Sequence, residues 1–449
     1  MTHGSGHANL NPGAHRPLPA SFVGGAARSV ALLLSISVIF YAACIDNYRQ
    51  ITPDPGQFAW PGAIVADPAG DFVYVVSTNF DSRYTGGTLI PIQVRPGSGG
   101  APVPVSKAAV EIGPFGGDAA VSLLGDGTTR IWVPIRDGDQ LDLVDSVRDA
   151  SNLPELECLA QESREKAEPG ADGDAYAFHR CRGDHVIDLK DYDFVDEEGT
   201  TFWANDAYGI SVGNQMRTFD GDVVNPVYVS GIVGSAVAVF TVAADGALQW
   251  RATLPITEGA HSIMEYVVDE FTRVLWITNR SVNLIDIIKL RFDRFGNVRE
   301  IPMPSVSADL LGSSGDYFRE MVRSGDGRLL YAAFRSPSSL TIFEILDGGG
   351  LRYRGLIPLD GTPSGVAIFN DNGKEVVYVT ESSLDFVYVI DPASMAVVSK
   401  VFVGAAPSGI AIADGRAFVA NFEDSTVSWF GVDSLRPDYH KVGIVEPRD

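Results

Sequence analysis

The sequence predicts an all-β fold, a seven-bladed β-propeller of four-stranded antiparallel blades that follows an N-terminal signal and lipid-anchor segment. Three observations predict it. A pattern recurs after about forty-four residues, each copy holds four short apolar and aromatic segments, and an apolar run near the start ends at a cysteine. Glycine, at 47 of 449 residues, suits a fold with many tight turns, because it adopts positive φ without a Cβ clash.

The first 43 residues have the features of a secretory signal. Arg16 and Arg28 are the only charged side chains before an apolar run that ends at Ala43. A basic start, a short apolar run and small residues before the cut are typical of such signals. The run is shorter than the roughly 20 apolar residues of a membrane-spanning helix. We therefore expect residues 1–43 to be a signal peptide and residues 44–60 to form a tether.

The segment Tyr41–Cys44 (YAAC) resembles a bacterial lipobox, although Tyr41 departs from the usual aliphatic residue. The resemblance implies cleavage before Cys44 and lipidation of its thiol, with the membrane as a partner through that lipid. Ile45 follows the cysteine, which by the same resemblance implies no retention at the inner membrane. The expected location is the bacterial outer membrane or its periplasmic face. A plain signal peptide with an incidental cysteine and an uncleaved anchor are the alternatives.

The repeat is clearest near the C-terminus. Pro363–Ile368 (PSGVAI) matches Pro407–Ile412 (PSGIAI), 44 residues further along. Apolar and polar residues alternate in the segments that follow, which is the period of a strand. Turn-forming residues separate these segments. The four strands expected in this unit are, in order, 363–368, 376–380, 386–391 and 397–403.

Weaker copies of the unit extend upstream and give seven blades over residues 61–449. His261 to Asn279 aligns without gaps to Pro363 to Glu381. A single blade leaves both faces bare, so blades must stack, and a closed ring leaves only short strand edges. The last blade needs a fourth strand, either from residues 440–445 or from the segment before Pro61. The blades are expected to begin near residues 61, 117, 208, 261, 316, 363 and 407.

The blade pattern resembles the YVTN-type β-propeller family. The matching features are Pro-Ser-Gly before the first strand, Val377–Thr380 (VYVT), Val387–Asp391 (VYVID) and Val403-Gly404 before the next proline. Family members are often surface-layer or secreted proteins, and lactonase-like and quinoprotein-like propellers look similar. The resemblance therefore implies a fold more than an activity.

An insert at about residues 146–200 interrupts the second blade. Cys158 and Cys181 bracket most of it, and they are the only cysteines besides Cys44. In an exported chain a disulfide between them is the favoured interpretation, and two free buried thiols are the alternative. His179 and His185 flank Cys181, but a cysteine tied in a disulfide leaves too few good metal ligands. We therefore expect no metal site.

Composition and motifs narrow the function. A net charge of −23 disfavours nucleic-acid binding, because phosphate backbones are repelled. The sequence contains no HExxH, GxGxxG or P-loop pattern, and no cofactor is expected. The expected function is a cell-envelope lipoprotein with a propeller scaffold for binding or assembly. Its partner would be a protein or small molecule at one face of the propeller.

Charged side chains stand where the innermost strands begin. The repeat alignment places Asp118, His261, Arg319 and Glu320 there, whereas other blades carry small residues. A histidine, an arginine and two acids around one axis could perform acid–base chemistry on an ester or lactone. They could equally solvate the channel, which is the favoured interpretation. A lactonase-like hydrolase using this axial pocket is the alternative function, and a quinone-cofactor dehydrogenase is a more distant third.

Overall fold

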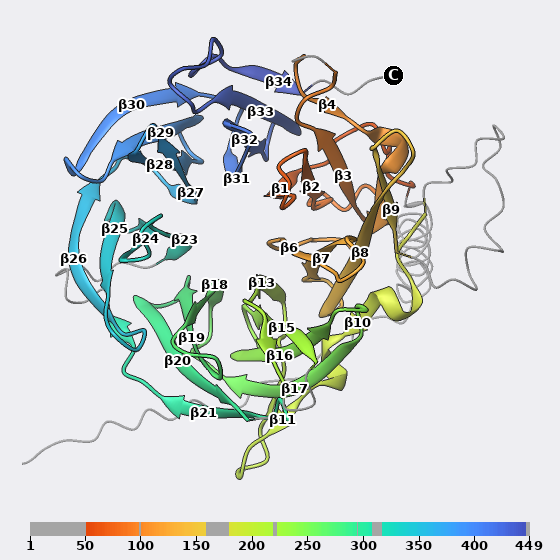
Figure 1. Ribbon diagram of the computed structural model, residues 1–449, viewed down its shortest axis with the longest axis vertical. Helices are drawn as coiled ribbons and strands as arrows, with labels where there is room; N and C mark the ends of the chain where they lie inside the picture. The colour runs from red at the N-terminus through yellow and green to blue at the C-terminus, as the bar shows by residue number, and fades with distance from the viewer. Residues whose placement is uncertain are drawn as a thin grey trace, which may run out of the picture. The chain divides into compact units, whose positions relative to one another are not determined.

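The computed structural model describes residues 51–97, 100–158, 179–218, 222–293, 295–307 and 317–445. These residues form an all-β ring of seven antiparallel blades, which confirms the predicted fold class (Figure 1). The signal segment and Cys44 lie outside the described residues. In the part of the chain that is described, no helix is long and apolar enough to cross a membrane.

The first four blades each carry a short fifth strand beside the expected four. Blade one contains β1 (Pro61–Ala66), β2 (Phe72–Ser77), β3 (Gly87–Gln93), β4 (Val103–Pro104), the 3₁₀ helix η1 (Ser106–Ala108) and β5 (Val110–Ile112). Blade two contains β6 (Ala120–Leu123), β7 (Thr129–Ile135), β8 (Gln140–Arg148), β9 (Pro154–Glu157), η2 (Gly183–His185), β10 (Val186–Asp188) and η3 (Leu189–Asp191). A separate hairpin follows it, made of β11 (Phe194–Val195) and β12 (Thr201–Phe202).

Blades three and four complete this half of the ring. Blade three contains β13 (Ala207–Val212), β14 (Met216–Arg217), β15 (Val223–Gly231), β16 (Ala236–Ala243) and β17 (Leu248–Pro255). Blade four contains β18 (Ala260–Val267), β19 (Thr272–Asn279), β20 (Leu284–Phe292), β21 (Val298–Pro302) and β22 (Val306–Ser307).

The last three blades have four strands each. Blade five contains β23 (Phe318–Arg323), β24 (Leu329–Arg335), β25 (Ser338–Ile345) and β26 (Leu351–Pro358). Blade six contains β27 (Pro363–Asp371), β28 (Lys374–Glu381), β29 (Phe386–Asp391) and β30 (Ala396–Phe402). Blade seven contains β31 (Pro407–Ala413), β32 (Arg416–Asn421), β33 (Thr426–Gly431) and β34 (Gly443–Val445).

The core lies between the blades. The second strands are almost continuously apolar, and every residue of β2 is buried, because each of these strands packs against a neighbouring blade on both faces. Outer strands such as β30 alternate between exposed and half-buried residues. A hydrophobic cluster fills each of the seven interfaces between blades, as Val76 and Val133 do between blades one and two.

The ring closes where blade seven meets blade one. The Ser408 hydroxyl donates a hydrogen bond to the Gly62 carbonyl at 2.9 Å, and β31 lies beside β1 (Figure 1). The fourth strand of blade seven is β34, which pairs with β33. Of the two alternatives open from the sequence, the C-terminal segment therefore supplies this strand. Residues before Pro61 still contribute, since Phe58 is buried at the same interface.

The insert in blade two is partly structural. β10 lies inside it and pairs with β8 as the outer strand of the blade, while β9 pairs with the other end of β8. Cys158 and Cys181 form a disulfide, as predicted. A disulfide is typical of an oxidising compartment outside the cytosol.

Candidate functional site

The start of each inner strand and the end of the second strand lie at one rim of the propeller, because the two strands pair antiparallel. Ala260 pairs with Asn279 in blade four, just as Pro363 pairs with Glu381 in blade six. The gapless alignment of His261 with Pro363 is therefore wrong by one residue in the inner strand. The turn between the first two strands is one residue shorter in blade six, so His261 occupies the position of the serine that follows Pro363.

The four predicted axial residues interact in two pairs, since the charge of Asp118 acts on Glu320 and the charge of Arg319 acts on His261. His261 and Arg319 take the second position of their inner strands, and Glu320 takes the third. Gly116 pairs with Ile135 in blade two as Ala260 pairs with Asn279 in blade four, so the two residues occupy equivalent positions. Asp118 lies two residues after Gly116 and therefore takes the third position, like Glu320, and not the second, like His261. We name Asp118, Tyr208, His261, Arg319 and Glu320 the axial cluster.

Asp118 and Glu320 are two carboxyl groups whose ionisation is linked by their charges. Burial raises the pKa of Asp118 to about 6, although the backbone N–H of Ala119 donates to its carboxylate at 2.8 Å. Burial, and then the charge of Asp118, raise the pKa of Glu320 well above its ordinary value. Among the described residues, Glu320 accepts one hydrogen bond, a long one of 3.3 Å from the N–H of Val366. Burial and the repulsion between two negative charges both disfavour ionisation of the two groups together, so one holds a proton near neutral pH.

His261 is a neutral imidazole in this setting. Its side chain is only 5% exposed, and burial lowers its pKa well below the ordinary value, helped by the charges of Arg319 and Arg280. Its ring lies 4.4 Å from that of Tyr208, between centroids. The Nδ1 atom has no hydrogen-bond partner among the described residues. A buried polar atom without a partner is costly, so a ligand that satisfied it would gain binding energy.

Tyr208 belongs to the cluster but was not predicted from the sequence. Burial raises its pKa to about 12, and the charges of Asp118 and Glu320 act in the same direction. Its hydroxyl therefore remains a hydrogen-bond donor at neutral pH. The repeat could have indicated Tyr208, because Tyr208 begins its repeat unit just as His261 begins the next one.

Three further arginines lie near the axial cluster and join its own Arg319. Arg136, Arg280 and Arg335 stand at the end of the second strands of blades two, four and five, and Arg319 comes from an inner strand. Only Arg136 has an acidic partner among the described residues, Asp206 at 2.6 Å. Arg335 donates only to uncharged oxygens, and the Nε of Arg319 has no partner there at all. Sequence analysis missed the three arginines that follow second strands, because each looks like an ordinary turn residue.

The arginines repel one another. The pKa of Arg319 is lowered to about 10 by burial and then by the charges of Arg335 and Arg280. Burial also lowers the pKa of Arg335. Like charges held together without a salt-bridge partner in the described parts of the chain form a site of positive potential, which an anion would stabilise. We name Arg280, Arg319 and Arg335 the arginine triad.

Aromatic rings occupy the same rim on the other side. The Phe80 ring contacts Trp60 at 5.8 Å, Phe422 at 5.4 Å and Phe115 at 6.2 Å, measured between ring centroids. Phe80 is 54% exposed, which is unusual for a ring this size. Phe115 joins the two groups, since its carbonyl accepts from the backbone N–H of Arg136 at 3.2 Å.

A metal role has no support in the residues that the structure describes, since they contain no group of three or more histidine, cysteine or acidic side chains that could hold an ion. The axial cluster can do two things chemically. It can bind an anion through the arginine triad, and it can move protons between a neutral imidazole and a carboxylate pair.

Comparisons with known proteins support the fold. No protein-family model matches the chain, and a search of curated proteins finds no match. Among solved structures, the chain is similar to hydrazine synthase from Kuenenia stuttgartiensis, with a TM-score of 0.52 and 15% identity over 86% of this chain and 98% of that one. It is also similar to a Bacteroides fragilis protein assigned as a 6-phosphogluconolactonase, with a TM-score of 0.50 and 15% identity over 78% of this chain and 86% of that one. At this identity the likeness concerns the fold alone.

Proposed function

We propose that this chain is an exported, lipid-anchored binding protein that takes a small organic anion at the axial rim of its propeller. The arginine triad is the observation that carries the proposal. Three guanidinium groups near one another, with no acidic partner among the described residues, raise the energy of the empty protein, and an anion would relieve it. The planar fork of arginine also matches carboxylate and phosphate groups.

The neighbouring groups favour an organic anion. Tyr208 offers a hydroxyl donor, and the Nδ1 of His261 is free to accept or donate according to its tautomer. The exposed Phe80 ring lies on the same rim and gives an apolar surface for a carbon skeleton. An inorganic ion would use only the arginines.

The test is calorimetric titration of the full chain in detergent with benzoate, gluconate and inorganic phosphate. We expect benzoate or gluconate to bind, and Arg280→Gln to weaken that binding by about tenfold, since one charged hydrogen bond contributes roughly 1.5–3 kcal/mol. Arg83→Gln is the matched control, because Arg83 is an exposed arginine paired with Asp81 at 2.9 Å. Equal binding by the Arg280→Gln variant and wild type would contradict the proposal, as would no binding by any of the three anions.

A lactonase-like hydrolase is a second candidate. One specific observation favours it, namely that the neutral His261 belongs to the same cluster as two carboxyl groups of raised pKa, Asp118 and Glu320, and such groups are suited to general acid–base catalysis. Hydrolysis of gluconolactone by wild type and by His261→Ala should be compared. A rate that falls by about a hundredfold in the variant supports catalysis. Equal rates in the two proteins would indicate a binding site without catalysis by His261.

The anchor is tested separately. Cys44 lies outside the described residues, and the proposal for it depends on the lipobox-like YAAC segment. Cys44→Ala should convert a protein that sediments with membranes into a soluble or unprocessed one. Labelling with a radioactive fatty acid should mark wild type only. Equal label in both proteins would exclude Cys44 as the attachment site.

A further inference from the structure

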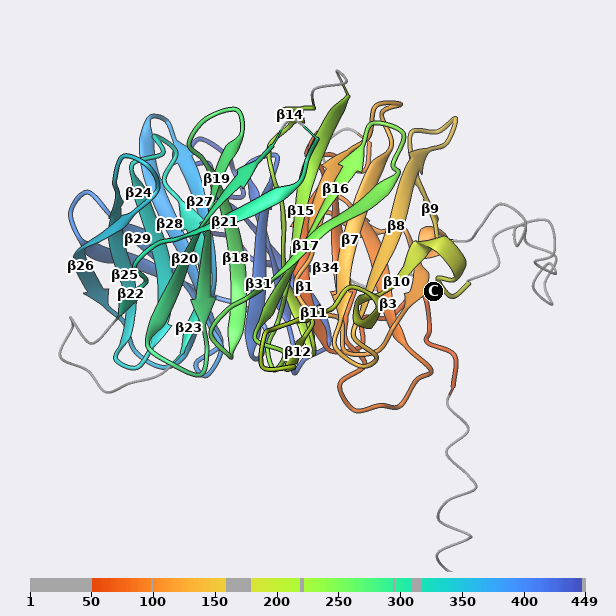
Figure 2. The same cartoon turned by 90° about the horizontal axis from the view of Figure 1, so that it is seen from below.

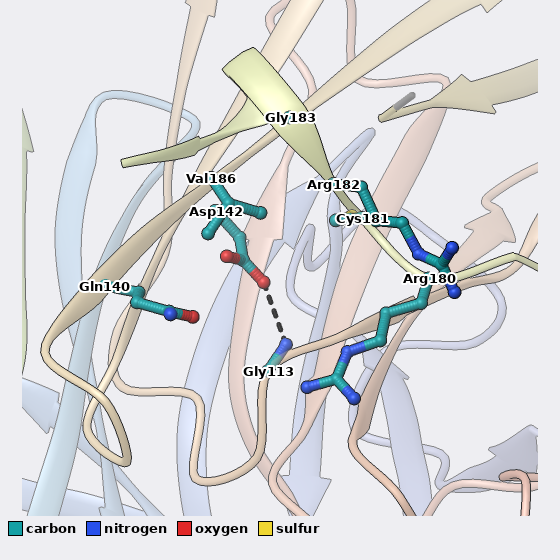
Figure 3. Close-up of a pocket in the computed structure, with 8 residues that line it drawn as sticks. All are labelled: Gly113, Gln140, Asp142, Arg180, Cys181, Arg182, Gly183 and Val186. Atoms are coloured by element: carbon teal, nitrogen blue, oxygen red, sulfur yellow. Dashed lines mark hydrogen bonds between the residues drawn. The ribbon is translucent and has the colours of Figure 1, made fainter. Parts of the chain in front are cut away.

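A second site lies at the outer edge of blade two, beside the disulfide and apart from the axial cluster. It is a pocket of about 370 Å³ between β8, β10 and the connection from blade one (Figure 3). The residues that line it come from described parts of the chain only. They are Gly113, Gln140, Asp142, Arg180, Cys181, Arg182, Gly183 and Val186.

A buried carboxylate forms one wall of the pocket. Asp142 is 1% exposed, and its Oδ2 accepts a hydrogen bond from the Gly113 N–H at 2.8 Å (Figure 3). Its Oδ1 has no partner among the described residues. Burial raises the pKa of Asp142 to about 7, so the empty site is badly matched to an ionised carboxylate. Such a group is stabilised by any donor or cation that reaches the free oxygen.

Two guanidinium groups form the opposite wall. Figure 3 shows Arg180 and Arg182 on the other side of the pocket from the Asp142 carboxylate. Arg180 has a side chain that is 45% exposed, and among the described residues it pairs with Glu111 at a loose 3.9 Å. No ion pair joins Arg180 to Asp142 among the described residues, although the positive charge of Arg180 lowers the pKa of that carboxyl slightly. The pocket therefore keeps a negative and a positive wall apart.

We propose that this pocket binds a small zwitterion that carries a primary ammonium and a carboxylate, such as a free α-amino acid or a dipeptide. The ammonium donates to the free Oδ1 of Asp142, and the carboxylate accepts from Arg180. Gln140 adds an amide that can donate or accept. A divalent metal ion fits less well, because two arginines line the pocket together with its only carboxylate.

The disulfide positions the cationic wall. Cys181 follows Arg180 directly and is tied to Cys158, whose carbonyl accepts from the Arg182 N–H at 3.1 Å. Binding should therefore depend on the disulfide as well as on the two charges. This inference is independent of the proposed axial function.

The experiment is calorimetric titration of the full chain in detergent with the twenty free amino acids and with alanylalanine. At least one should bind with a Kd of about 1 mM or tighter, equivalent to roughly −4 kcal/mol. Asp142→Asn keeps the shape of the side chain and removes its charge, and Arg180→Gln does the same on the other wall. Each should weaken binding by about tenfold or more, whereas the exposed control Arg83→Gln should not.

Matched half-ligands separate the two walls. Where L-alanine binds, ethylamine lacks the carboxylate and propionate lacks the ammonium. Asp142→Asn should abolish the binding of ethylamine and leave the binding of propionate unchanged. Arg180→Gln should abolish the binding of propionate and leave the binding of ethylamine unchanged. If no member of the panel binds, the proposal is overturned, and Asp142 and the arginines would then interact only with each other in solution. It is also overturned by unchanged binding in Asp142→Asn.

Discussion

Asp142 makes the stability of the protein depend on pH in a defined direction. Its pKa is about 7 in the folded chain, against an ordinary value of 3.8, because it is buried. Between those values the folded state holds more protons than the unfolded state, so this group's contribution to stability falls as pH rises from about 4 to 7.

Asp142→Asn should remove that dependence. The free energy of unfolding of the variant, compared with wild type, should therefore rise between pH 4 and pH 7 by on the order of 3 kcal/mol and then level off. Denaturant unfolding at several pH values measures it. Taking the difference between the two proteins cancels the contributions of Asp118 and Glu320, whose pKa values are raised too. A constant difference across this range would contradict the buried, unpaired environment of Asp142.

Glu265 lies at the centre of a buried network. Its carboxylate accepts from the Tyr228 hydroxyl at 2.8 Å and from the Asn214 N–H at 2.8 Å, and it lies 3.4 Å from Arg273, whose side chain is 1% exposed. Glu265→Ala should lower the free energy of unfolding by about 3–5 kcal/mol, because it leaves a buried guanidinium without its counter-charge. Glu344→Ala, at an exposed pair with Arg352, should cost less than about 1 kcal/mol. Similar losses in the two variants would contradict this account.

At the scale of elements, the disulfide holds the segment that supplies the outer strand of blade two. The two cysteines are 23 residues apart, and β10 begins five residues after Cys181 at Val186. Replacing both cysteines with alanine should cost roughly 3 kcal/mol on the chain-entropy model. A reducing agent should lower the melting temperature of wild type and leave that of the double variant unchanged. A reductant effect of equal size in both proteins would show that the bond does not carry this stability.

At the scale of the whole molecule, the last residues close the ring. β34 pairs with β33, and Val445 is fully buried in the cluster shared by blades seven and one. Deleting residues 436–449 would expose the edge of β33 and also remove Asp438, which pairs with Arg416 at 3.0 Å. We expect a loss of several kcal/mol, detectable by thermal unfolding. Leu435→Ala is the control, since Leu435 is 77% exposed. An unchanged melting temperature after the deletion would contradict a role in closure.

Local patterns in the sequence were sufficient to predict the architecture. Strand and turn preferences are local, so the match between Pro363–Ile368 and Pro407–Ile412 gave the length of the repeat, and its weaker copies upstream gave the number and order of the blades. The pairing of Cys158 with Cys181 followed from there being no other candidates once Cys44 was set aside. Four members of the axial cluster were also found this way, because they are charged residues or histidine at positions where other blades carry small residues.

How the charges meet depends on the tertiary structure. Arg280 and Arg335 stand in different blades and look like turn residues, and the repulsion between them exists only once the ring has formed. The level of Asp118 depended on strand register, where a shift of one residue turns a side chain to the other face. The free oxygen of Asp142 depends on burial beneath the insert, which no local pattern records. Coulomb energy and desolvation sum over groups that are distant along the chain, whereas repeats and turns report only on neighbours.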